Sequence, residues 1–147
     1  MLDAPIARVE NLRVEFQTKQ GLVVGVEDVS FEINPGETVC VVGESGSGKS
    51  VSSLSLMRLV EFGGGKIADG RLLFDRKAEG IVDLAQTDQA LMRSIRGNEI
   101  GMIFQEPMTA LNPVFTVERQ LTEGLRLHKS LTRCLLYTSE LPTMVQV

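Results

Sequence analysis

The chain has 147 residues and a formal net charge of −4 at neutral pH, from 15 basic and 19 acidic side chains. Hydrophobic residues make up 43% and charged residues 23%, which is typical of a folded globular domain and excludes general disorder. The acidic balance gives no overall attraction to nucleic acid, and two cysteines are too few for a disulfide framework. No apolar run reaches the roughly 20 residues of a membrane-spanning helix, and the first residues do not form a secretory signal. We therefore expect a cytosolic protein.

The first part of the chain is predicted to form short antiparallel strands. Its apolar residues are mostly β-branched or aromatic and partly alternate with polar ones, a pattern typical of strands. Turns are expected at residues 19–21 and 34–37, where glycine or a Pro-Gly pair favours a reversal of the chain. The predicted strands cover residues 9–16, 22–26 and 29–33.

The rest of the chain alternates predicted strands and helices. Continuous apolar runs at 38–42 and 100–104 are typical of strands buried on both faces, as in a parallel sheet. Cys40 lies in the first run and is expected to be an inert buried residue. Strands alternating with helices behind an antiparallel layer indicate an α/β fold with a β-rich annex. The other predicted elements are helices over 49–60, 87–96 (capped by Thr87) and 117–127, and a hairpin of 71–74 with 81–82.

A phosphate-binding loop is predicted between the first buried strand and the helix that follows it. Residues 43–50 read G-E-S-G-S-G-K-S and fit the pattern G-x-x-x-x-G-K-[ST]. Glycines let backbone N–H groups wrap the β- and γ-phosphates of a nucleotide, and the N-terminus of the helix adds positive charge. The Lys49 ammonium would contact these phosphates, and the Ser50 hydroxyl would ligate Mg²⁺. The predicted nucleotide-binding residues here are Gly43, Glu44, Ser45, Gly46, Ser47, Gly48, Lys49, Ser50 and Val51.

The absence of an N-K-x-D motif argues against a GTPase. Two stretches of the chain together resemble another known family of nucleotide-binding proteins. Residues 11–51, which include Phe16, the turn N-P-G-E-T and the phosphate loop, resemble the start of the ATPase of ATP-binding cassette (ABC) transporters. Residues 102–113, M-I-F-Q-E-P-M-T-A-L-N-P, resemble the Q-loop region of that family. The likeness covers about residues 6–133, and more narrowly the chain resembles the ATPase subunits of bacterial dipeptide, oligopeptide and glutathione importers.

The resemblance implies a fold and a set of roles. The fold would be a P-loop NTPase (RecA-like) core with an antiparallel β subdomain, and the ligands would be ATP and Mg²⁺. Phe16 would stack on adenine, and Gln105 would reach Mg²⁺ or the attacking water. Lys49 and Gln105 would thus serve hydrolysis, while Ser50 and Gln105 would hold the metal. Residues 108–111 would lie where a coupling helix of the membrane subunits docks.

The resemblance also implies partners and a location. An importer ATPase works as a head-to-tail dimer with a second ATPase subunit or domain, on two transmembrane permease subunits served by a periplasmic substrate-binding protein. It lies on the cytoplasmic, inner face of the bacterial cell membrane. It couples ATP binding and hydrolysis to the transport of peptides or glutathione, and no nucleic acid is expected among its partners.

Some motifs of the family do not occur after Gln105. The signature loop, the Walker B Asp-Glu pair and the switch histidine are absent from residues 106–147. We therefore interpret residues 1–133 as the N-terminal part of an ABC nucleotide-binding domain, ending before the helical signature subdomain, and expect little hydrolysis by this chain alone. Residues 134–147 no longer resemble the family and are interpreted as a non-native or frame-shifted tail.

Alternative readings stay open on the sequence alone. A P-loop kinase of a small metabolite would need an arginine-bearing lid, for which only Arg93 and Arg96 qualify. A non-catalytic nucleotide-binding fragment is the second alternative. Asp75 and Asp83 are interpreted as hairpin turn residues, and His128 as a surface residue at a helix end.

Overall fold

The computed structural model describes residues 4–105 and 111–129 of the chain. The chain divides into two compact units, residues 1–92 and residues 93–147, which we call the N-terminal and the C-terminal unit. Residues 106–110, which include most of the predicted coupling-helix contact, and the predicted tail at 134–147 lie outside the described residues.

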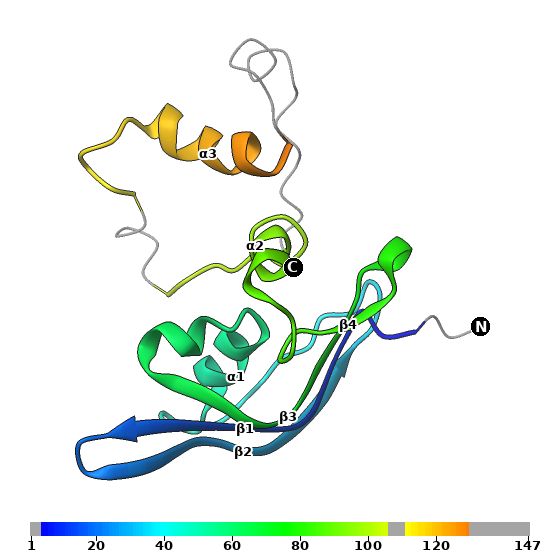
Figure 1. The fold of residues 1–147 in the computed structure, drawn as a ribbon, viewed down its shortest axis with the longest axis vertical. Helices are drawn as coiled ribbons and strands as arrows, with labels where there is room; N and C mark the ends of the chain where they lie inside the picture. The colour runs from blue at the N-terminus through cyan, green and yellow to red at the C-terminus, as the bar shows by residue number, and fades with distance from the viewer. Residues whose placement is uncertain (1–3, 106–110, 130–147) are drawn as a thin grey trace. The chain divides into compact units, whose positions relative to one another are not determined.

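The N-terminal unit is built on a four-stranded antiparallel sheet with the strand order β2-β1-β3-β4 (Figure 1). Strand β1 (Ala7–Thr18) lies between β2 (Gly21–Ile33) and β3 (Gly65–Asp75), and the short β4 (Ile81–Asp83) pairs with β3. The antiparallel strands predicted before residue 34 and the predicted hairpin after residue 70 are therefore confirmed. The two strands predicted at 22–26 and 29–33 form a single long strand.

A β-bulge interrupts the pairing of β1 with β2. Val14 pairs with Val26 and the next residue, Glu15, pairs with Val24, so Gly25 is the extra residue. A bulge bends its strand and increases the local twist. Phe16, two residues after Val14, pairs with Val23 on one side and with Gly65 on the other.

The core lies between the sheet and a helical layer over one of its faces (Figure 1). That layer consists of α1 (Lys49–Leu56) and the 3₁₀ helix η1 (Leu59–Gly63). The predicted helix over 49–60 is thus confirmed as far as Leu56, where α1 ends; Arg58 has a φ of 51°, outside the helical range, and the last two predicted residues belong to η1. The largest fully buried side chains described in the N-terminal unit are Val9, Leu12, Val14, Ser55, Leu72, Leu84 and Met92.

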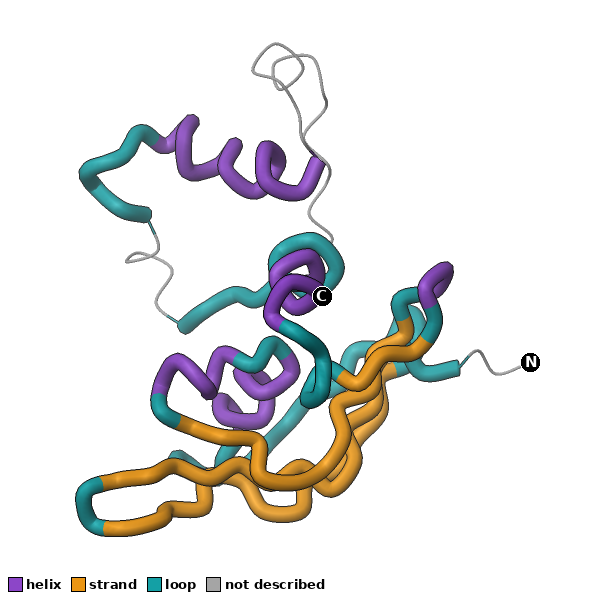
Figure 2. Tube along the Cα trace, in the orientation of Figure 1, coloured by secondary structure: helices purple, strands orange, loops and turns teal. Residues whose placement is uncertain are grey.

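The two predicted buried strands are wrong. Residues 34–48 run as a loop from β2 to α1 (Figure 2), and Val42 is 86% exposed. In the second run Ile103 is 75% exposed, and the one bridge that this run makes to the described residues is the parallel pair Arg96–Ile100. An apolar run becomes a strand only when a neighbour completes its backbone hydrogen bonds, and none of the described strands pairs with either run. Cys40 is accordingly exposed, not buried as predicted.

The remaining helices agree with the prediction except at one cap. Helix α2 (Gln89–Ile95) buries Met92 and Ile95, and its first turn is capped by Asp88, whose Oδ1 accepts a 2.8 Å hydrogen bond from the Leu91 N–H. The predicted cap, Thr87, instead donates its hydroxyl to the Asp83 carbonyl at 2.7 Å. Two elements complete the described fold: the 3₁₀ helix η2 (Lys77–Glu79) and α3 (Val117–Lys129).

Helix α3 belongs to the C-terminal unit and buries none of its side chains. The loop before it is fastened by Gln120, whose Oε1 accepts from the Asn112 N–H at 2.8 Å and whose Nε2 donates to the Phe115 carbonyl at 3.0 Å. No helix within the described ranges has the length and apolar character needed to cross a bilayer.

Leu72 tests where the core of the N-terminal unit lies. Its side chain is 0% exposed, so Leu72→Ala should lower the free energy of unfolding by about 2–5 kcal/mol, measured by chemical denaturation. Leu22→Ala is the control, because Leu22 is 57% exposed on β2 and its truncation should change stability by less than about 0.5 kcal/mol. Equal effects of the two substitutions would contradict the described core.

The turn after β2 gives a prediction on pH. Hydrogen bonds from the Asn34 backbone N–H (2.9 Å) and side-chain amide (2.8 Å) lower the pKa of the Glu37 carboxyl below its ordinary value. A lowered pKa adds stability at pH values above the pKa of the unfolded chain, and this contribution is lost as pH falls through the folded pKa. Asn34→Ala should raise the Glu37 pKa in an NMR titration, whereas Gln17→Ala at the far end of β1 should not. An unchanged Glu37 pKa in Asn34→Ala would contradict the assignment.

Candidate nucleotide-binding site

The predicted phosphate loop connects residues 38–42 to the first turn of α1. Gly46 and Gly48 have φ angles of 82° and 89°, a left-handed backbone that side chains rarely adopt. Within the loop, the Ser47 N–H donates to the Glu44 carbonyl at 3.2 Å. A Cβ on Gly43 would lie 2.5 Å from the Ser47 Oγ, so a side chain at the start of the loop would displace the Ser47 hydroxyl.

Gly48 allows the N-terminus of α1 to lie in close contact with the sheet. A Cβ on Gly48 would lie 2.7 Å from the carbonyl oxygen of Gly25 and 3.0 Å from a methyl carbon of Val26. Only a glycine permits this approach of the N-terminus of α1 to β2. The buried Ser52 continues the same contact surface and donates its hydroxyl to the Gly48 carbonyl at 3.0 Å.

Lys49 lies across the loop that precedes it. Its Nζ donates to the carbonyls of Gly43 at 2.7 Å and Glu44 at 2.5 Å, and lies 3.4 Å from the Ser47 Oγ. The ammonium is therefore held at the loop, next to the backbone N–H groups that begin α1. A glycine-rich loop, a fixed cation and a helix N-terminus suit a bound triphosphate, and the exposed Ser50 hydroxyl in the first turn suits a magnesium ligand.

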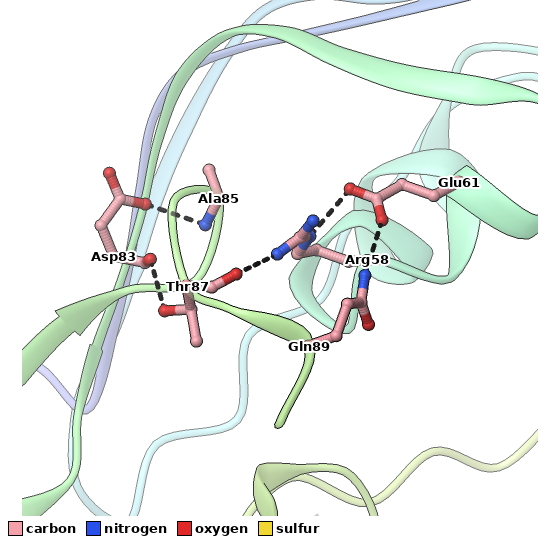
Figure 3. A network of polar contacts seen from close by, with 6 residues as sticks. All are labelled: Arg58, Glu61, Asp83, Ala85, Thr87 and Gln89. Carbon is pink, nitrogen blue, oxygen red and sulfur yellow. Dashed lines mark hydrogen bonds and ion pairs between the residues drawn. The ribbon is translucent and has the colours of Figure 1, made fainter. Parts of the chain in front are cut away.

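The other end of α1 is fixed by a polar network around Arg58 (Figure 3). The Arg58 Nε donates to Glu61 at 2.8 Å, and its Nη1 donates to the Thr87 carbonyl. Gln89 approaches the second oxygen of Glu61 at 3.3 Å. Asp83 receives the Thr87 hydroxyl on its carbonyl and the Ala85 N–H on its carboxylate (Figure 3). The network ties the turn after α1 to the segment that follows β4.

Comparison with known protein families shows to which family the chain belongs. The family model described as ABC transporter matches residues 26–143 of the chain. The chain belongs to the ABC transporter family. Its members are ATPases, and an ABC domain implies ATP binding.

Proteins of similar sequence include import ATP-binding proteins of bacteria. The chain is 53% identical over 129 residues to a protein named peptide import ATP-binding protein in Brucella abortus (strain 2308), covering 88% of this chain and 38% of that protein. It is 46% identical over 128 residues to the glutathione import ATP-binding protein GsiA of Escherichia coli (strain K12), covering 87% of this chain and 20% of GsiA. The chain thus spans well under half the length of these relatives.

A solved ABC structure shares the fold. The dimeric structure of MJ0796, a bacterial ABC transporter cassette, superposes with a TM-score of 0.62 at 22% sequence identity. The match covers 95% of this chain and 50% of that chain. The predicted fold class, an ABC-type P-loop domain with an antiparallel β subdomain, is therefore confirmed.

The predicted site residues of the ABC domain fall in both units. Phe16 and residues 43–51 all belong to the N-terminal unit, where Gly25 lies next to both the Phe16 ring and Gly48. Gln105 belongs to the C-terminal unit and is exposed. The roles predicted for Phe16, Lys49, Ser50 and Gln105 stay predictions.

Two aspartates outside the phosphate loop, Asp75 and Asp83, accept hydrogen bonds within turns. The Asp75 Oδ1 accepts from the Lys77 N–H at 2.8 Å, and the Asp83 Oδ1 accepts from the N–H groups of Leu72 at 3.1 Å and Ala85 at 3.0 Å. Both therefore act as turn residues, as predicted. Across residues 4–105 and 111–129, no cluster of three or more His, Cys, Asp or Glu side chains could hold a metal ion.

Sequence reasoning missed Gly25, Gly65 and the Arg58 network. An isolated glycine inside the β-branched run of β2 is a signal for a bulge, so Gly25 could have been found. The i, i+3 spacing of Arg58 and Glu61 also indicates an ion pair. Nothing in the sequence places the Thr87 carbonyl beside Arg58, because that contact bridges 29 residues.

Arg58→Met tests the network at the end of α1. The Arg58 side chain is only 14% exposed, and its loss leaves Glu61 and the Thr87 carbonyl short of a donor, so stability should fall by about 1–3 kcal/mol. The control is Arg71→Met, which breaks the ion pair to Glu10 at a side chain that is 63% exposed, and should change stability by less than about 1 kcal/mol. Chemical denaturation measures both, and a smaller loss in Arg58→Met than in Arg71→Met would contradict the assigned importance of the network.

Proposed function

We propose that this chain is the ATP-binding portion of a bacterial ABC importer for peptides or glutathione, coupling ATP binding and hydrolysis to transport. The single observation that carries the proposal is the geometry of the loop 43–48. Its glycines at 46 and 48 have a left-handed backbone, and the ammonium of Lys49, the first residue of α1, is hydrogen-bonded to the start of the loop. The substrate class follows the printed names of the relatives, which are peptide and glutathione import proteins. ABC family membership favours this function over a P-loop kinase.

The phosphates of ATP bind the N–H groups of the loop and the start of α1. Lys49 is held at the loop by two carbonyl oxygens, so its charge is in place before a phosphate arrives, and little conformational entropy is lost on binding. The main-chain amides and the ammonium together balance the negative charge of the β- and γ-phosphates.

Ser50 and Gln105 are proposed to hold Mg²⁺, and Phe16 to stack on adenine. A magnesium ion held by these two residues would supply positive charge beside the phosphates. The Gln105 amide oxygen orients the attacking water, and the Phe16 ring offers a face to the base. Such stacking contributes about 1–3 kcal/mol per base.

The importer around this chain is part of the same proposal. A head-to-tail dimer with a second ATPase subunit or domain would act on two permease subunits, at the inner face of the membrane, with the periplasmic binding protein engaged indirectly. The dimeric ABC cassette that shares the fold supports dimerisation in general. Hydrolysis requires residues that this chain does not supply, so the chain alone is expected to turn ATP over negligibly.

Lys49→Ala tests the proposed phosphate site. Titration of the full chain with a fluorescent ATP analogue and Mg²⁺ should show saturable binding, which Lys49→Ala weakens at least about tenfold because the ammonium is lost. Lys66→Ala is the control, since Lys66 is an exposed lysine on β3, and should bind within about twofold of the wild type.

Two results would contradict the proposal. Folded wild-type chain that shows no magnesium-dependent binding would exclude the phosphate site. A steady ATPase rate of the chain that Lys49→Ala abolishes would contradict the expectation of negligible turnover.

A further inference from the structure

The Phe16 ring lies on the face of the sheet that carries the core. Side chains alternate along a strand, so Phe16 shares its face with Val14, which is fully buried. Val14 pairs with Val26, and a Val26 methyl carbon lies 3.0 Å from the place of a Cβ on Gly48. Phe16 therefore projects toward the side on which α1 begins, and it is half-buried there.

Two glycines flank this ring. A Cβ on Gly65 would lie 2.7 Å from the Phe16 Cε1 and 3.0 Å from its Cζ. A Cβ on Gly25 would lie 2.6 Å from the Cε2 and 3.1 Å from the Cδ2. Cε1 and Cε2 belong to opposite edges of the ring, so one glycine lies at each edge. Real Cβ atoms essentially never come closer than 3.0 Å to another heavy atom, so either addition would displace the ring.

The backbone does not explain why these positions are glycine. Neither Gly25 nor Gly65 has a positive φ, so other residues can adopt their conformations. What both positions require is the absence of a Cβ beside Phe16. Both positions have a second neighbour as well: the Gly25 carbonyl oxygen lies where Gly48 passes closest to the sheet, and a Cβ on Gly65 would also lie 3.0 Å from the Val60 carbonyl oxygen.

We propose that Gly25 and Gly65 are positioning residues for the nucleotide base, because together they fix the orientation of the Phe16 ring beside the phosphate loop. The inference rests on the proposed function, in which Phe16 stacks on adenine. A stacking platform works only when its face is presented to the base, and a ring pushed aside at either edge loses that alignment.

A purely structural role for this cluster makes a different prediction. An aromatic ring that covers glycines of neighbouring strands also stabilises a sheet by itself. That role would change stability, or affinity for every ligand alike. A positioning role changes the affinity for the base and spares the affinity for the phosphates, so a ligand without a base separates the two.

Gly65→Ala in the full chain is the test, with calorimetric titration of ATP and of inorganic tripolyphosphate, each with Mg²⁺. The variant should bind ATP at least about fivefold more weakly and tripolyphosphate within about twofold of the wild type. Gly63→Ala is the matched control, because Gly63 has no positive φ and nothing within 4 Å of its added Cβ. It should bind both ligands as the wild type does.

Two further variants guard against misfolding and indirect effects. If Gly65→Ala does not fold, as judged by circular dichroism, Gly25→Ala should give the same selective loss of ATP. Phe16→Ala should weaken ATP binding, and adding Gly65→Ala to it should have no further effect, because the ring through which the glycine acts is gone.

The outcomes separate the inference from the proposed function. A folded Gly65→Ala chain that binds ATP as the wild type does, or that loses ATP and tripolyphosphate equally, overturns the inference. Wild-type chain that binds ATP no more tightly than tripolyphosphate overturns it too, while leaving the phosphate loop in place. Wild-type chain that binds neither ligand overturns the proposed function itself.

Discussion

The close approach of Gly48 to the Gly25 carbonyl is the constraint on which the site depends. An added Cβ would lie 2.7 Å from that oxygen, so the N-terminus of α1 meets β2 where neither partner carries a side chain. This contact fixes the first turn of α1, and with it the backbone N–H groups that a phosphate would bind. A larger residue at position 48 would also have to adopt the left-handed backbone measured there. One glycine therefore meets two requirements.

The helix that carries the loop is held at both ends. At its start, Ser52 bonds back to the Gly48 carbonyl, and at its end Arg58 links Glu61 to the Thr87 carbonyl. The cationic Lys49 bridges the loop through the Gly43 and Glu44 carbonyls. Such a site resists rearrangement when an anion binds, which favours affinity because little order must be created. The antiparallel sheet serves as the base against which this arrangement is set.

The sequence predicted the local elements well and the long-range pairing poorly. Alternation in β1 and β2, the turn at residue 34 and the glycine pattern of the loop are local signals, and each agrees with the structure. The run at 38–42 has the composition of a buried strand, yet it lies exposed, because strand formation depends on a neighbour that composition does not reveal. In the site, residues 43–51 followed from one motif, whereas Gly25 and Gly65 became visible only through their distances to Phe16.

We propose that the amides at the start of α1 receive the phosphates of ATP. The decisive experiment follows the amide chemical shifts of the full chain by NMR during titration with magnesium ATP. The largest shifts should occur at the amides of residues 44–50, and these shifts should saturate together. Saturable binding that leaves these amides unchanged, with the shifts located elsewhere in the chain, would rule out this phosphate site.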